Sequence, residues 1–375
     1  MWSVRFETVK DTSARAVAAS LLLSAFVVTG TTPVSASPPT TKVSFSEHGS
    51  HLLAFSCSST QLCVGSNGDD VEVSRNGGGR WKLVSKSVGP TGGSRVESFD
   101  CPAVATCYAA GGVAPDAFVM TTTDLVHWRR HNLVEPMTST MYPWSLHCLT
   151  SRICLVGGGE GQDNDPGVML RTVDGGTSWT SVALPTNTAM VWGIQCPTSV
   201  DCVALAGLVP AHVPMGAGSD GFQIISTSDG GIHWSPRYRS VNFQPGDISC
   251  ASISTCVVGV YPNMDQPALG VGPMLRSLDG GVSWRRVATT IGERPEIVSC
   301  VSEVRCVGER TSGEVQDIGE SSDGGATWSW RPVPSPPGNG LPGPPQLQCQ
   351  SASTCLLLMS AGSVGGTALF QIKVP

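Results

Sequence analysis

Short apolar segments separated by polar, glycine-rich turns run along most of this chain, and four such segments recur in a fixed order. In the clearest unit they span residues 191–196, 202–206, 222–227 and 234–238. Segments of this length, bounded by turn-forming residues, indicate β-strands. The pattern therefore predicts a repeated unit of four antiparallel strands.

Cysteine spacing gives the number of units. All 14 cysteines fall into seven pairs with the same Cys-x5-Cys spacing, and successive first cysteines lie 44 to 54 residues apart. A period of this length is typical of propeller blades. The fold class predicted is therefore all-β, a seven-bladed β-propeller of four-stranded antiparallel blades. The pairs are Cys57/Cys63, Cys101/Cys107, Cys148/Cys154, Cys196/Cys202, Cys250/Cys256, Cys300/Cys306 and Cys349/Cys355.

The N-terminus has the layout of a secretory signal peptide. Arg5, Lys10 and Arg15 precede an apolar run at 16–28, and Val-Ser-Ala at 34–36 is a small-x-small cleavage candidate. The run is short for a membrane span, so a retained anchor is the less favoured alternative. We expect residues 1–36 to be cleaved, with no membrane insertion afterwards. Residues 37–375 would remain as a single, monomeric propeller domain that is secreted or lies on the exterior of the cell envelope.

Each cysteine pair is interpreted as a disulfide within one blade. An even number of cysteines in an exported chain is typical of disulfides. The alternative is zinc, but structural zinc prefers closer cysteine spacing, and the seven histidines are scattered. We therefore expect one intrablade disulfide per blade, no metal site and no cofactor.

An eight-residue phrase occupies the turn between the third and fourth segments of most units. Each full copy has Asp-Gly-Gly at its centre and Trp at its end, whereas the copy at 74–81 carries Asn76 and a shortened one lies at 122–128. Asp can accept hydrogen bonds from turn N–H groups, and Gly adopts backbone angles closed to other residues. The phrase therefore predicts a tight hairpin turn covered by Trp. The full copies are 172–179, 227–234, 277–284 and 321–328.

The seventh unit has only three segments, 346–349, 355–359 and 368–374, and no phrase. The segment 41–47 after the leader is its natural fourth strand. Pairing there would close the ring through the N-terminal strand and leave no open edge. The alternative is an open solenoid of hairpins, which would leave an unpaired strand edge at each end and give segment 41–47 no pairing partner.

Composition narrows the partners. Only 14% of residues are charged, the chain has 44 Gly and 27 Pro, and its net charge is −6. This turn-rich balance agrees with an all-β protein. A mildly acidic surface does not attract nucleic acid or anionic membranes, so neither is expected as a main partner.

The phrase S/T-x-D-x-G-x-x-W resembles the Asp-box, or BNR, repeat. Over essentially the whole mature chain, the sequence is similar to propellers of the sialidase type and the photosystem II assembly factor type. In that family the Asp-box lies on the outer rim, between the third and fourth strands. The resemblance therefore implies structural roles for Asp174, Asp229, Asp279, Asp323, Trp81, Trp128, Trp179, Trp234, Trp284 and Trp328.

Ligand-binding residues are expected at the mouth of the axial channel, near the long loops at 157–167, 207–221 and 261–273. Strand alternation should place the positions four and six residues before each first cysteine on one side. Aromatic platforms beside paired charges would suit a carbohydrate or an extended peptide. The alternative is that the aromatics fill a narrow channel and each Arg pairs with its neighbouring Glu. The candidates are Arg95, Glu97, Tyr142, Trp144, Trp192, Arg294 and Glu296.

The resemblance to assembly-factor-type propellers, which bind other proteins, implies a non-enzymatic scaffold, and we expect its ligand to be a protein or a glycan. Sialidases use three arginines, a Tyr–Glu pair and an Asp acid, and these positions supply only two arginines and one tyrosine. No catalytic residue is therefore assigned. The alternative is a glycoside hydrolase in which Glu97 and Glu296 act as acid and base. A purely structural envelope component is the third possibility.

Overall fold

A computed structural model describes one compact unit of the chain, within Thr40–Pro375. The described residues are 43–46, 52–68, 70–86, 95–112, 116–133, 141–159, 166–209, 221–241, 243–262, 274–287, 294–312, 315–333, 346–361 and 366–373. The predicted leader, residues 1–36, lies outside them. Within these ranges there are 28 strands and no helix, and hence no helix that could span a membrane.

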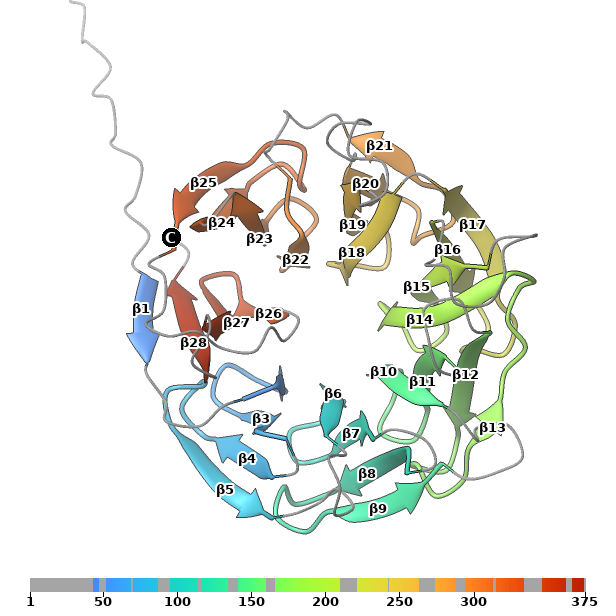
Figure 1. Cartoon of the computed structure of the whole chain (residues 1–375), viewed down its shortest axis with the longest axis vertical. Coiled ribbons are helices and arrows are strands. Elements are labelled where there is room, and N and C mark those ends of the chain that lie inside the picture. The colour runs from blue at the N-terminus through green and yellow to red at the C-terminus, as the bar shows by residue number, and fades with distance from the viewer. Residues whose placement is uncertain are drawn as a thin grey trace, which may run out of the picture. The chain divides into compact units, whose positions relative to one another are not determined.

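The strands form seven four-stranded antiparallel sheets around a common centre (Figure 1). Within blades one to six, the strands follow chain order from the centre to the rim. Blade one contains β2 (Ala54–Cys57), β3 (Cys63–Ser66), β4 (Val71–Ser74) and β5 (Trp81–Ser85). Blade two contains β6 (Val96–Asp100), β7 (Cys107–Gly111), β8 (Phe118–Thr122) and β9 (Arg129–Asn132). Blade three contains β10 (Tyr142–Cys148), β11 (Cys154–Gly159), β12 (Gly167–Thr172) and β13 (Thr180–Ser181).

The remaining blades repeat this order. Blade four contains β14 (Thr188–Gln195), β15 (Cys202–Leu208), β16 (Phe222–Thr227) and β17 (Ser235–Ser240). Blade five contains β18 (Phe243–Cys250), β19 (Cys256–Pro262), β20 (Met274–Ser277) and β21 (Arg285–Val287). Blade six contains β22 (Ile297–Cys300), β23 (Cys306–Ser312), β24 (Val315–Ser321) and β25 (Ser329–Pro332). The predicted seven-bladed, all-β propeller is confirmed.

Blade seven takes its outer strand from the other end of the described chain. It contains β26 (Gln346–Ser351), β27 (Thr354–Ala361) and β28 (Gly366–Lys373), with β1 (Val43–Ser46) antiparallel to β28. Val43 pairs with Ile372 and Ser46 with Leu369. That this strand is what closes the ring stays a prediction.

Apolar packing lies between the blades, because each sheet buries both faces against its neighbours. Strand β15 is buried along its whole length. Val203 and Leu205 pack into a cluster with blade five, whereas Ala204 and Ala206 pack with side chains of blade three. Alternate residues of the strand thus pack against two different blades, which explains why the second strands are apolar along their whole length in the sequence.

Each blade has one disulfide, which joins the first strand to the second at or beside the hairpin between them. All seven predicted pairs are formed, and no described cysteine is free. The intrablade disulfides predicted from the spacing are therefore confirmed, and seven of them indicate an oxidising environment. The bridges are Cys57–Cys63, Cys101–Cys107, Cys148–Cys154, Cys196–Cys202, Cys250–Cys256, Cys300–Cys306 and Cys349–Cys355.

The hairpin of blade seven corrects one predicted boundary. The sequence predicted strands at 346–349 and 355–359, with Cys355 as the first residue of the second strand, but that position is wrong by one residue. Strand β27 begins at Thr354, and Cys355 is its second residue. The reason is that Ser351 pairs with Thr354 beyond an irregular step after Cys349, so pairing continues past the bridge into a tighter turn. The Cys355 side chain is buried in the cluster between blades six and seven.

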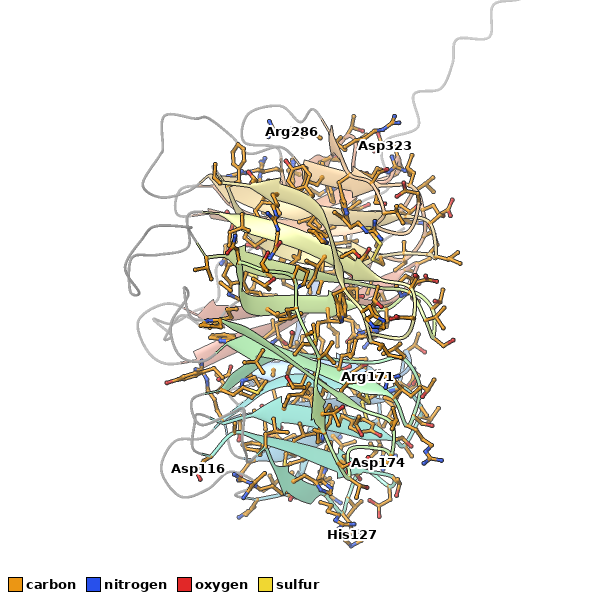
Figure 2. The ribbon with its side chains drawn as sticks, turned by 90° about the vertical axis from the view of Figure 1, so that its right-hand side faces the viewer. Asp116, His127, Arg171, Asp174, Arg286 and Asp323 are labelled. Atoms are coloured by element: carbon orange, nitrogen blue, oxygen red, sulfur yellow. A yellow bond between two sulfur atoms is a disulfide. The ribbon has the colours of Figure 1, made fainter. Side chains whose placement is uncertain are left out.

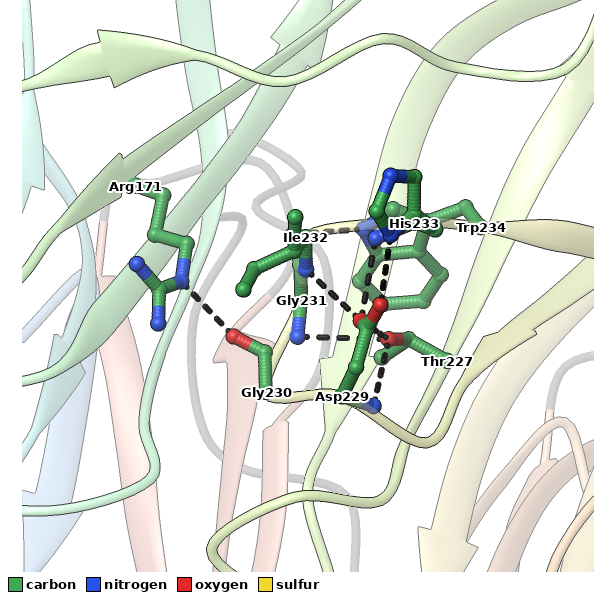
Figure 3. Close-up of polar contacts among 8 residues, drawn as sticks. All are labelled: Arg171, Thr227, Asp229, Gly230, Gly231, Ile232, His233 and Trp234. Atoms are coloured by element: carbon green, nitrogen blue, oxygen red, sulfur yellow. Dashed lines mark hydrogen bonds and ion pairs between the residues drawn. The ribbon is translucent and has the colours of Figure 1, made fainter.

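The repeated phrase forms the turn between the third and fourth strands, shown for blade four in Figure 3. Asp229 Oδ1 accepts the two backbone N–H groups that precede Trp234, both at 3.0 Å. Gly230 and Gly231 have φ of 74° and 84°, values that favour glycine. The Trp234 indole donates to the Gly231 oxygen at 3.2 Å, and Arg171 of blade three donates to the Gly230 oxygen at 2.7 Å.

The other full copies bond in the same way. Asp174, Asp279 and Asp323 each accept hydrogen bonds within their own turns. The Ser178 hydroxyl, which bonds to Asp174, is the main cause that holds the pKa of this carboxyl well below its usual range. Figure 2 shows Asp174 and Asp323 towards one face of the ribbon and Asp116 towards the other. None of these carboxylates lines the central cavity described below.

A second repeated contact joins the inner strands of successive blades. In four blades, the side chain just before the first cysteine accepts the backbone N–H of the next blade's first cysteine. The first strand of each blade has no neighbouring strand on its central side. This contact gives the cysteine N–H on that side a hydrogen-bond acceptor. The pairs are Asp100 to Cys148 (2.6 Å), Ser249 to Cys300 (2.8 Å), Ser299 to Cys349 (3.0 Å) and Gln348 to Cys57 (2.8 Å).

Candidate functional site

A cavity of about 620 Å³ lies where the seven first strands converge. Every blade contributes lining residues, so its wall is built by β2, β6, β10, β14, β18, β22 and β26. A concave site of this size is large enough for a small ligand or for a segment of a larger one. It is the natural starting point for a functional interpretation.

Four consecutive first strands carry a β-bulge where they line this cavity. Val96 pairs with Gly111 and Ser98 with Ala110, which leaves Glu97 as the extra residue. By the same reasoning Trp144 is extra in blade three and Trp192 in blade four. In blade five the irregular step lies between Pro245 and Ile248 and contains Asp247. Glu97, Trp144, Trp192 and Asp247 all line the cavity, and we call them the bulge residues.

Glycines make room for the distorted strands. A Cβ on Gly158 would lie 1.9 Å from the Tyr142 oxygen, so the backbone beside Trp144 could not approach β11 if any other residue stood there. A Cβ on Gly246 would lie 2.1 Å from the Glu296 oxygen of blade six. Bulges often re-aim a side chain beside a functional site, and these four act on adjacent blades.

The candidates chosen from the sequence do not all line the cavity. Glu97, Trp144 and Trp192, four residues before a first cysteine, line it, whereas Arg95, Tyr142, Arg294 and Glu296 are not among the lining residues. In blades two to four the extra residue at a bulge interrupts the two-residue alternation, so positions four and six before the cysteine need not share a side. Whether any of the seven binds a ligand stays a prediction.

The candidates outside the cavity have other contacts. Arg95 forms an ion pair with Glu97, and its side chain is 44% exposed. Arg294 donates to the Val260 oxygen at 2.6 Å. Tyr142 begins β10 opposite Gly159. Glu296 precedes β22, and its backbone N–H donates to the Glu309 oxygen at 2.7 Å.

The cavity wall is acidic. Three carboxyl groups line it, those of Glu97, Asp100 and Asp247, together with His147, whereas no Lys or Arg is among the lining residues. Burial raises the pKa of Asp247 to about 7, although the Ile248 N–H donates to its Oδ1 at 2.7 Å. The Asp100 carboxylate lies 3.7 Å from the His147 ring.

Asp247, Asp100 and His147 were missed by the sequence-based choice. Asp100 and His147 stand directly before a first cysteine, a position that lines the cavity in all seven blades. That register was available in the sequence. The position of Asp247 on the cavity wall could not be predicted, because it depends on an irregular strand and bulges leave little trace in a single sequence.

The described residues offer no cluster with metal-binding character. Among these ranges, no three His, Cys, Asp or Glu side chains are placed to hold a metal ion. The interiors of the three long loops, at 160–165, 210–220 and 263–273, lie outside the described residues.

Comparison with known proteins supports the propeller fold and gives no family. No family model matches the sequence, and no curated protein matches it either. Among solved structures, YCF48 bound to a D1 peptide is similar with a TM-score of 0.59 at 14% identity, over 89% of this chain and 97% of that one. At this level of identity the likeness establishes the propeller fold alone.

Two enzymes share the fold as well. A GH74 enzyme of Niastella koreensis has a TM-score of 0.61 at 14% identity, over 85% of this chain and 53% of that chain. A GH74 xyloglucanase of Xanthomonas campestris has a TM-score of 0.55 at 13% identity, over 86% and 53% respectively. The present chain therefore spans about half the length of these enzymes. The BNR repeat name stays a prediction from the sequence.

Proposed function

We propose that the protein is an exported, non-catalytic binding scaffold of the BNR propeller type, which receives a protein segment or a glycan in its central cavity. The observation that carries the proposal is the run of bulge residues on blades two to five, which line one cavity with two indoles and two carboxyl groups. Indole faces stack on sugar rings and on apolar side chains, and carboxylates fix orientation.

The neighbours are compatible with this proposal. One of them, YCF48, was solved with a D1 peptide bound, and others are GH74 enzymes. The seven disulfides agree with export after removal of residues 1–36, and we take the mature domain to be a monomer.

The proposal is tested by measuring ligands directly. A glycan array and a pull-down from the secreting cell, both with the mature protein, should return a ligand whose binding is lost in W144A/W192A. The matched control is Trp330→Ala, which removes an indole from outer strand β25 and should leave binding intact. If the wild-type protein captures nothing, or if Trp330→Ala loses as much binding as W144A/W192A, the cavity is not the binding site.

A glycoside hydrolase is the second candidate, and Asp247 is the observation that favours it. A carboxyl with a pKa of about 7, in a cavity that other carboxyl groups also line, has the protonation behaviour of a general acid. Glu97 and Asp247 would then be the acid–base pair, in place of Glu97 and Glu296. Release of reducing sugar from a polysaccharide panel, abolished in D247N and in E97Q, would establish this activity. If the wild type releases no product from any polysaccharide, the hydrolase function is excluded for that panel.

A further inference from the structure

The outer strands of the blades carry a charge opposite to that of the whole chain. Six strands, β5, β9, β13, β17, β21 and β25, form the rim of blades one to six. Together they contain eight Lys or Arg residues and no Asp or Glu. The chain as a whole has a net charge of −6. The outer strands themselves are therefore positively charged, in contrast to the chain as a whole.

The densest group lies on blades four and five. Arg237 and Arg239 are exposed on β17, and Arg285 and Arg286 are exposed on β21. The Arg286 Nε donates to the Tyr238 hydroxyl at 3.3 Å, so the two strands lie close together across the gap between blades. We call these four residues the arginine cluster, of which Arg286 is labelled near the upper edge of the ribbon in Figure 2.

The charge of the cluster is not neutralised within the described part of the chain. None of the four arginines forms an ion pair with a described carboxylate. Arg237 bonds to the Ser226 hydroxyl and Arg286 to a phenol, both neutral partners. Arg285 lies directly opposite Arg276 across β20 and β21. Like charges at opposite positions repel, so Arg276 does not neutralise the charge of Arg285.

Protection of the strand edge does not account for the cluster. A cation on an edge strand does discourage pairing with another chain. Blade three, however, has no cation on β13 and instead keeps that strand to two residues. Blades four and five carry two arginines each on adjacent strands, with half-buried Tyr238 between them. This arrangement provides four exposed guanidinium groups around one aromatic side chain on the outer strands of two neighbouring blades.

We propose that the arginine cluster binds an acidic polysaccharide through its sulfate or carboxylate groups. Guanidinium groups bind such oxyanions in bidentate fashion, and several in a row hold a chain of repeating charge. The rim is convex, so a flexible polymer can follow it where a flat membrane meets only a narrow strip. The oxidising environment indicated by the disulfides is one where such glycans occur and nucleic acids are scarce. This site is separate from the central cavity and does not rest on the function proposed for it.

The test measures binding of the full mature protein to two defined probes, a sulfated heparin hexasaccharide and a carboxylated oligogalacturonate, with neutral dextran as a blank. We expect the wild type to bind at least one acidic probe in a salt-dependent manner. R237E/R239E should weaken that binding by about tenfold or more, since two attractive charges become repulsive. The probe that binds more tightly identifies the preferred acid group.

The matched control is R75E/R80E, which changes the same net charge at two exposed arginines of a blade-one turn and should leave binding unchanged. W144A/W192A should also bind normally, which separates this site from the cavity. Equal melting temperatures of the rim and control variants would show that both are folded. The proposal is overturned if the wild type binds neither acidic probe, or if R75E/R80E loses as much affinity as R237E/R239E. Cluster-dependent binding to phosphatidylglycerol vesicles with none to the glycans would overturn it too.

Discussion

Glu309 should make the protein less stable as the pH rises from 5 to 8. Its side chain is 0% exposed, and neither carboxyl oxygen has a hydrogen-bond partner among the described residues. Its cross-strand neighbours are Ile297 and Ile318. Burial, followed by the nearby charges of Glu296 and Asp317, raises the pKa of Glu309 from 4.5 to about 8.

The direction follows from the protons bound in each state. In the unfolded chain Glu309 loses its proton near pH 4.5, whereas in the folded protein it keeps the proton up to about pH 8. Between these two pH values the folded state binds one proton more than the unfolded state. The resulting stabilisation of the folded state is fully present below pH 4.5 and is lost as the pH rises to about 8. Each pH unit in that window removes about 1.4 kcal/mol from the free energy of unfolding. Local relaxation around the charged carboxylate reduces the total change. Between pH 5 and pH 8 we therefore expect Glu309 to lower the free energy of unfolding by about 1 to 4 kcal/mol.

The assay is guanidinium unfolding, with disulfides intact, of wild type and Glu309→Gln at pH 5, 6.5 and 8. The free energy of unfolding of E309Q relative to wild type should rise with pH, because the variant has no proton to lose. D247N is measured in parallel, since the raised pKa of Asp247 gives the wild type a second contribution of the same sign. Equal pH slopes in wild type and E309Q would refute the assignment of a buried, neutral carboxyl at position 309.

Three further results are expected. Replacing Cys196 and Cys202 with Ser opens a loop of about seven residues and should lower the free energy of unfolding by about 2 kcal/mol, measured by denaturant titration; no change would show that the bridge contributes little to stability. Gly158→Ala places a Cβ against the Tyr142 oxygen, so it should lower the melting temperature and shift the fluorescence of Trp144, whereas an unaltered spectrum would contradict the tight approach. Deleting Val43–Ser46 leaves β28 as an open edge and should promote association at high concentration, seen by light scattering; a monomeric, equally stable variant would show that β1 is not needed to close the ring.

Repetition made the fold predictable. The Cys-x5-Cys spacing and the phrase around Asp229 recur in register, so one correctly interpreted hairpin implied six others. Element ends were less certain: β14 begins at Thr188, three residues before the segment predicted at 191–196, and β27 begins one residue before Cys355. Both extensions adjoin an irregular step in the pairing, which no local propensity specifies.

The site was predicted only in part, for a physical reason. Counting from the cysteines assumes that every strand keeps strict alternation, and this held well enough to select Glu97, Trp144 and Trp192. Bulges break the assumption at the same residues, because the extra position depends on how the partner strand and the next blade pack. Asp247 shows the limit most clearly, since its raised pKa comes from burial that only the assembled ring provides.

The link between each inner strand and the next has a consequence for how such a ring can change in size. In blades six and seven the accepting side chain and the donating N–H belong to the same repeat, one residue apart, so a copy of either repeat carries both halves of the contact. Duplication or loss of either of these two repeats would leave every remaining contact with a partner. The number of blades must therefore be fixed elsewhere, by the wedge angle at which apolar faces such as those flanking β15 fit against each other.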